Sequence, residues 1–200
     1  MHASESLRAN LQSILVDLID LHLQGKQAHW NIVGPNFRDL HLQLDEIIEE
    51  VREFSDQLAE RLRALNAQPD GRTETVAATS HLPHFPAGEV LTTDAVTLIT
   101  ERLTITVDNI RTVHDDVDQE DPTSADILHG FIEKLEQYAW LVSAENRQPQ
   151  SNSRAQSATP AQSQPAQSQP AQSQAAQSPD TASLLAQAPR PASRTARVTE

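Results

Sequence analysis

The stretch FRDLHLQLDEIIEEVREFSDQLAERLRALN, residues 37–66, decides the fold of this 200-residue chain. Its apolar side chains recur every three or four residues, the spacing that places them on one face of an α-helix. That face comprises Leu44, Ile47, Val51, Phe54, Leu58, Leu62 and Leu65. A long helix with a single apolar stripe must bury it against other elements, so the stretch predicts a helical bundle.

Three other segments have the same periodicity. They cover about residues 6–32, 93–118 and, after the Asp121-Pro122 restart, the chain to about residue 146. Ser4 or Ser6 can cap the first of them, and the turn GPN at 34–36 separates it from the second. A long connection at 72–90 has a weakly helical centre and permits the helices on either side to run parallel. We therefore predict an all-α four-helix bundle whose long crossover contains a short helix.

Two pairs of ligand-type residues stand four apart in the 37–66 helix, His41/Asp45 and Asp56/Glu60, and His29 precedes them. Residues at i and i+4 lie one above the other on a helix, so each pair can bind one metal ion. Asp45 and Asp56 are eleven residues apart, roughly 16 Å along the axis, so the two pairs cannot share an ion within one chain. If they build one site, two antiparallel copies of the helix must supply it.

The same residues point about 150° away from the centre of the apolar stripe, which makes the ligand candidates face outward. The chain contains no Glu-x-x-His motif, the pattern by which many di-metal bundles aim ligands inward. Spacing alone leaves a second interpretation open. The charged residues of this helix can be a solvated face held by i,i+4 ion pairs.

Composition limits the classes of function. The chain has no cysteine, which excludes disulfides and thiolate metal sites. Its net charge of −13, with Lys26 and Lys134 as the only lysines, repels nucleic acid phosphate and attracts cations. The first residues lack the pattern of a secretory signal, and no apolar run is long enough to span a bilayer. We expect a cytoplasmic protein that does not enter membranes.

The character of the sequence changes near residue 148. Residues 149–200 repeat PAQSQ and carry four arginines against one aspartate and one glutamate, a net charge of +2. They offer too few large apolar side chains to offset the entropy of the chain. We predict a folded domain at 1–148 and a disordered Pro/Ala/Gln/Ser-rich tail at 149–200. That tail is either a solvated appendage or a contact for DNA or neighbouring subunits.

Several strings of this chain resemble the Dps family, the ferritin-like DNA-binding proteins from starved cells. They are KQAHWN (26–31), GPNF (34–37), LH with the following aspartate (40–45), DQLAER (56–61), SADIL (124–128) and EQYAW (136–140). The resemblance covers about residues 7–147, and the long tail is similar to that of actinobacterial members. It implies a ferritin-like bundle assembled from dimers into a hollow shell of twelve subunits.

The resemblance also implies a ferroxidase. Five family ligands are present: His29, His41 and Asp45 would come from one subunit, and Asp56 and Glu60 from its partner across a two-fold interface. This di-iron site would oxidise Fe(II), typically with hydrogen peroxide, and ferric mineral would be stored inside, which protects DNA from oxidative damage. Nitrogen and oxygen ligands suit iron but also Mn, Zn or Co, so ligand chemistry alone does not choose the metal.

Other residues have more open interpretations. Trp30 either packs near the site and intercepts oxidising equivalents or is an interface aromatic. In Dps-like shells the acidic region at 115–126 lines three-fold pores, and we choose Asp121 and Asp126 as candidates, against the alternative of a solvated loop. The remaining helical histidines, His22, His114 and His129, are expected to be surface or packing residues.

Two other functions compete with this one. A nucleoid protein that compacts DNA and binds iron incidentally is one, although residues 1–10 lack the lysine-rich arm of strongly DNA-binding family members. An inert four-helix shell with a degenerate site is the other.

Overall fold

The computed structural model describes residues 2–149, which form four long helices and one short one. The long helices are α1 (Glu5–Asn31), α2 (Phe37–Ala64), α4 (Thr92–Glu120) and α5 (Pro122–Ala144), and the short helix is α3 (Thr73–Thr79). The predicted all-α bundle with a short helix in its crossover is confirmed for this range. The predicted tail at 149–200 lies outside the described residues apart from Pro149.

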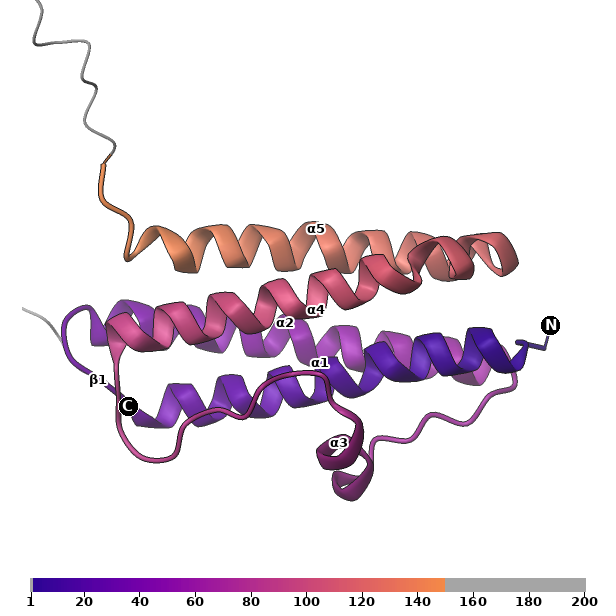
Figure 1. Cartoon of the computed structure of the whole chain (residues 1–200), viewed down its shortest axis with the longest axis horizontal. Helices are drawn as coiled ribbons and strands as arrows, with labels where there is room; N and C mark the ends of the chain where they lie inside the picture. The colour runs from indigo at the N-terminus through magenta and orange to yellow at the C-terminus, as the bar shows by residue number, and fades with distance from the viewer. Residues whose placement is uncertain (1, 150–200) are drawn as a thin grey trace, which may run out of the picture. The chain divides into compact units, whose positions relative to one another are not determined.

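The four long helices form two antiparallel hairpins, α1–α2 and α4–α5, which pack on each other through α1 with α4 and α2 with α5. The connection through α3 returns along the bundle, so that α2 and α4 run in the same direction (Figure 1). This is the parallel arrangement that the long crossover predicted.

The core lies between the two hairpins. All seven apolar residues of the predicted stripe in α2 are buried. At the contact of α2 with α5, the rings of Phe54 and Phe131 stack with their centroids 4.3 Å apart. Each long helix buries one stripe and keeps a polar face. Accordingly, none of the helices within residues 2–149 has the length and apolar character that a membrane span requires.

Local sequence signals set the ends of α1 and α2. The hydroxyl of Ser4 accepts a hydrogen bond of 3.0 Å from the backbone N–H of Leu7, so Ser4 caps α1. Between the helices, Gly34 has φ 120° and Asn36 has φ 57°. A Cβ at residue 34 would also lie 3.2 Å from the hydroxyl of Thr92, so both the backbone angle and the space favour glycine.

Two very short strands join the ends of the hairpins. Strand β1 (Ile32–Val33) pairs in parallel with β2 (Val90–Leu91), with Ile32 opposite Val90. The sequence analysis missed this pair because a two-residue strand is too short to show alternation. The pair fixes the end of α1 beside the start of α4.

Asp17 of α1 anchors the returning connection to the bundle. Its side chain is completely buried, and its carboxylate accepts hydrogen bonds from the backbone N–H of His81, at 2.9 Å, and from the side-chain amide of Asn109. A buried carboxylate needs such donors to replace water. Asp17 therefore holds residue 81 against α1 and α4.

Arg102 of α4 is a second anchor, and its side chain is 1 % exposed. The guanidinium donates to the side-chain oxygen of Gln24 and to the carbonyl oxygens of Pro83 and His84, the last two at 2.9 Å. Burial lowers the pKa of Arg102 from its ordinary value. Periodicity does not reveal such a residue, because a charged side chain in a helix normally indicates the solvent face.

Candidate metal centre

Three of the five candidate ligands converge at one end of the α1–α2 hairpin. His29 lies in the last turn of α1, and His41 and Asp45 lie near the start of α2. One ligand atom from each of the three lies within 4.8 Å of those of the other two. Within residues 2–149 no other group of three or more His, Asp or Glu side chains meets this distance. The turn at 32–36 brings them together by reversing the chain.

His29 is buried, with 8 % of its surface exposed, and its ring stacks on that of His41 at a centroid distance of 3.6 Å. Its Nδ1 has no hydrogen-bond partner. Its Nε2 lies 2.9 Å from a carboxylate oxygen of Asp45, a contact that contributes to the lowered pKa of that carboxyl. An unsatisfied buried polar group costs about 1–3 kcal/mol. A metal ion bound to the His29 ring would remove that cost, and Asp45 offers an oxygen ligand beside the ring, so these residues fit a nitrogen- and oxygen-ligated metal.

His41 has a partner that fixes its tautomer. Its Nδ1 lies 3.1 Å from the backbone carbonyl oxygen of His29, which can only accept, so Nδ1 carries the proton and donates. In this tautomer of the neutral ring, Nε2 is the nitrogen that can bind a metal. This is the usual outer-shell arrangement for a metal-binding histidine, and the sequence did not identify it.

Lys26 belongs to this site although the sequence analysis gave it no role. Its ammonium donates a hydrogen bond of 2.6 Å to Asp45. That bond is the main reason why the pKa of Asp45 lies below its ordinary value. The signal was present in the sequence, because Lys26 precedes His29 by three residues and so shares its face of the helix.

Asp56 and Glu60 are not brought to the other three ligands. Both are exposed on α2. Because α2 is continuous from 37 to 64, Asp56 lies roughly 16 Å along the helix axis from Asp45. Asp56 borders a groove of about 420 Å³ between α1 and α2. Its lining also includes Ile19 and Ala59. The structure thus contains one cluster of three ligands and a separate, outward-facing carboxylate pair.

Trp30 follows the buried His29 but lies on the surface, with 70 % of its area exposed. It is the most exposed of the large hydrophobic side chains within residues 2–149. The position does not decide between the two interpretations of Trp30.

Asp121 does not suit the pore role that we expected. It is 3 % exposed, and both carboxylate oxygens accept from the guanidinium of Arg61, at 2.6 and 2.8 Å. Burial opposes its ionisation, but hydrogen bonds from Ser124 and Arg61 outweigh burial and lower the pKa of Asp121. The residue locks the α4–α5 junction to α2. The sequence suggested a loop position for Asp121 because it precedes Pro122. Its partner Arg61 lies 60 residues earlier, so the sequence does not show the pairing.

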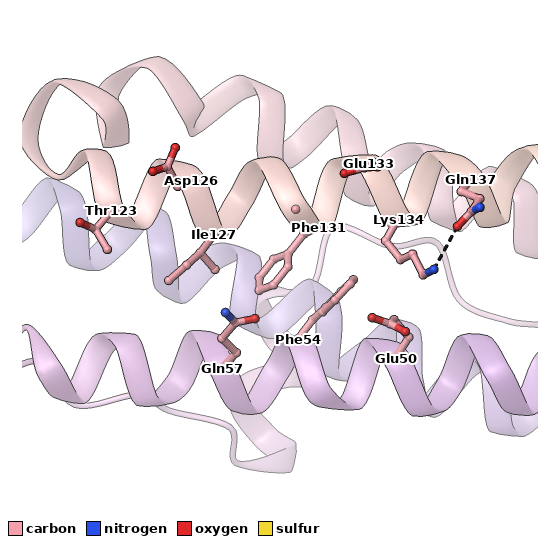
Figure 2. Close-up of a pocket in the computed structure, with 11 residues that line it drawn as sticks. Glu50, Phe54, Gln57, Thr123, Asp126, Ile127, Phe131, Glu133, Lys134 and Gln137 are labelled. Atoms are coloured by element: carbon pink, nitrogen blue, oxygen red, sulfur yellow. Dashed lines mark hydrogen bonds between the residues drawn. The ribbon is translucent and has the colours of Figure 1, made fainter.

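Asp126, the other pore candidate, is exposed on α5. It borders a groove of about 700 Å³ between α2 and α5, with the stacked Phe54 and Phe131 at its base. Figure 2 shows Asp126 pointing away from α2, whereas Ile127 and Phe131 point toward it. Its role in a pore stays a prediction.

Comparison with known proteins places the chain in a family. The ferritin-like domain family matches residues 8–149. The DNA protection during starvation protein 2 of Deinococcus radiodurans is 35 % identical over 134 residues, or 67 % of this chain and 56 % of that protein. The DNA protection during starvation protein of Agrobacterium fabrum is 32 % identical, over 72 % of this chain and 89 % of its own. This chain belongs to the Dps family.

The likeness of this Dps-family chain extends to solved structures. A crystal structure of Dps from Deinococcus radiodurans has a TM-score of 0.68 and 34 % identity, and the match covers 70 % of this chain and 87 % of that one. The ferritin-like fold inferred from the sequence is therefore confirmed. The chain spans 56 % of the length of the Deinococcus relative named above, so its own activity has to be argued from its own residues.

Proposed function

We propose that this chain is a ferroxidase and iron-storage protein whose site is completed across a dimer interface. His29, His41 and Asp45 of one subunit would face Asp56 and Glu60 of its partner. The observation that carries the proposal is the separation of the five ligands into two groups. His29 of α1 and His41 and Asp45 of α2 converge within 4.8 Å, whereas Asp56 and Glu60 are exposed farther along α2. A symmetric dimer with antiparallel α2 helices would create two such sites at once.

Two surface features support an interface on this face. Trp30 is exposed beside the three-ligand cluster, and the groove next to Asp56 offers space for residues of another copy. The expected assembly is a homo-oligomer of dimers, twelve subunits around a hollow interior. Ferric mineral would collect in that interior.

The donor set suits iron oxidation. Fe(II) is the substrate, and carboxylate oxygens stabilise the more highly charged Fe(III) more strongly, which favours loss of an electron. Hydrogen peroxide is the proposed oxidant: two Fe(II) ions give up one electron each, and peroxide with two protons becomes two waters. Removing Fe(II) and peroxide together would protect DNA from oxidative damage without contact with DNA.

The acidic α4–α5 junction would supply the route for iron. The exposed carboxylates there are Asp115, Asp116, Asp118, Glu120 and Asp126. Around a three-fold axis even one of them per chain would form a cation-attracting ring. We choose Asp126, since Asp121 is occupied by Arg61.

Mixing of two inactive variants tests the shared site. One variant carries Asp56→Ala and Glu60→Ala, and the other carries His29→Ala and His41→Ala. Each alone should lose rapid Fe(II) oxidation, measured by ferric absorbance in stopped flow. After co-refolding at equal amounts, half of the dimers contain both variants and have one intact site of two. About a quarter of the original rate should return.

A site contained within one chain predicts a different result, because no mixture of these variants could then restore activity. Unchanged oxidation in the Asp56→Ala, Glu60→Ala variant alone would reject the ligand assignment. A matched control is Asp94→Ala, an exposed carboxylate on α4, which should leave the rate unchanged.

A DNA-compacting role is the second candidate, and only the net charge of +2 at 149–200 favours it. Salt-dependent gel retardation of the full chain and of residues 1–148 separates the two functions. If the full chain retards DNA and the shorter one does not, the tail binds DNA.

A further inference from the structure

Two histidines that the proposed function does not use lie together on the other hairpin. His114 is in α4 and His129 is in α5, seven residues before and eight residues after Asp121. The hairpin therefore sets them side by side. Their ring centroids are 4.1 Å apart, and the ring planes are inclined by 35°.

The ring nitrogens of His114 have no good hydrogen-bond partner in the packed structure. Its side chain is 15 % exposed, and its Nε2 is buried without a hydrogen-bond partner. Its Nδ1 lies 3.4 Å from a carboxylate oxygen of Asp115, a long contact to a fully solvated group. A buried imidazole nitrogen without a hydrogen-bond partner, beside a second imidazole, would be satisfied by a metal ion bound between the two rings.

We propose that His114 and His129 bind a divalent transition-metal ion at a site separate from the ferroxidase ligands. Imidazole nitrogen suits Zn²⁺, Ni²⁺ and Cu²⁺, so the expected ligand is an ion of this class. Two nitrogens bound tetrahedrally at about 2.0–2.1 Å lie roughly 3.4 Å apart, which rings at this separation can supply. The ring tilt must increase, and the broad χ2 of histidine permits that for the exposed His129.

Neighbouring carboxylates favour a cation at this place. Asp118 follows His114 by one turn, and Asp126 and Glu133 flank His129 by one turn on either side. All three are exposed, but none forms a group of three ligand atoms within 4.8 Å with the two imidazoles, so each would bind the ion through water or after its side chain turns. Two helices that each contribute one imidazole would also be clamped together by the ion, which adds stability to the hairpin.

Zinc is the best probe, because Zn²⁺ has no redox chemistry and binds both histidine sites. Crystals of the full chain soaked in ZnCl₂ should show an anomalous peak within about 2.1 Å of one nitrogen of each of His114 and His129. In solution, His129→Gln should lower the zinc bound at saturation by one ion per chain in equilibrium dialysis. The control His84→Gln changes another exposed histidine and should lose none.

Two outcomes would overturn the proposal. One is a zinc peak at His29, His41 and Asp45 with no density between His114 and His129. The other is unchanged zinc stoichiometry in His129→Gln. Circular dichroism and oligomer size establish that the variant is folded, and the peak at the first site serves as an internal standard for occupancy.

Discussion

Replacing Arg102 by methionine should destabilise the protein by about 3 kcal/mol. The substitution removes a guanidinium that donates to Gln24, Pro83 and His84. Hydrogen bonds to a charged group contribute about 1.5–3 kcal/mol each, and a stranded buried acceptor costs about 1–3 kcal/mol. Gln24 is 6 % exposed and would be stranded, whereas the carbonyls of the exposed residues 83 and 84 can rebind water. The expected destabilisation is therefore well below the sum of three charged hydrogen bonds.

Arg111→Met is the matched control, since it removes another arginine from α4. Arg111 pairs with Glu136, and both side chains are more than half exposed. Such surface pairs contribute at most about 1 kcal/mol. Urea unfolding at equal protein concentration should separate the two variants by at least about 2 kcal/mol.

Hydrogen exchange locates the effect. In Arg102→Met the amides of His81 and Leu82, which donate to Asp17 and Ser80, should exchange faster than in the parent, because the connection loses its second anchor. Arg111→Met should leave them unchanged. Equal destabilisation by the two substitutions, or unchanged exchange at residues 81 and 82 in Arg102→Met, would refute the anchoring role.

Three other substitutions test further parts of the structure. Asp121 has a lowered pKa, so its stabilisation is complete above about pH 4 and is lost as pH falls toward the folded pKa. Asp121→Asn should lower the Tm at pH 7 and flatten its decline below pH 4. Gly25→Ala would place a Cβ 2.9 Å from Ile48 and should cost about 1–3 kcal/mol in urea unfolding, whereas a gain in stability would contradict this close approach of α1 to α2. Asp126→Asn should slow iron incorporation into the assembled protein, measured as mineral absorbance, and an effect no larger than that of Asp94→Asn would exclude it from the iron route.

The positions of the helices and the buried stripe were predictable because apolar residues spaced three or four apart lie on the helix face that becomes buried. Leu44 and Leu58, for example, are completely buried, as the pattern requires. The ligand cluster was only partly predictable: spacing placed His41 above Asp45, but the contact with His29 depends on the turn at 32–36. The family resemblance supplied that contact.

Long-range polar pairs were not predictable. Arg61 and Asp121 are 60 residues apart, and nothing local marks Asp121 as buried or Arg61 as its partner. The same holds for Asp17 with the connection. A charged residue in a helix normally lies on the solvent-exposed face. A charged residue that is buried can therefore be identified only when the packing shows which partner it binds.

The pairing of Ile32 with Val90 turns everything between them into a closed loop that contains the whole of α2 and α3. Closing a loop of this size costs about 3–4 kcal/mol in chain entropy, more than a pair of two-residue strands returns. The pairing therefore depends on docking of the two hairpins, which brings the strands together. Amide protection at these strands thus reports whether the two hairpins are docked, beside His29 in the last turn of α1.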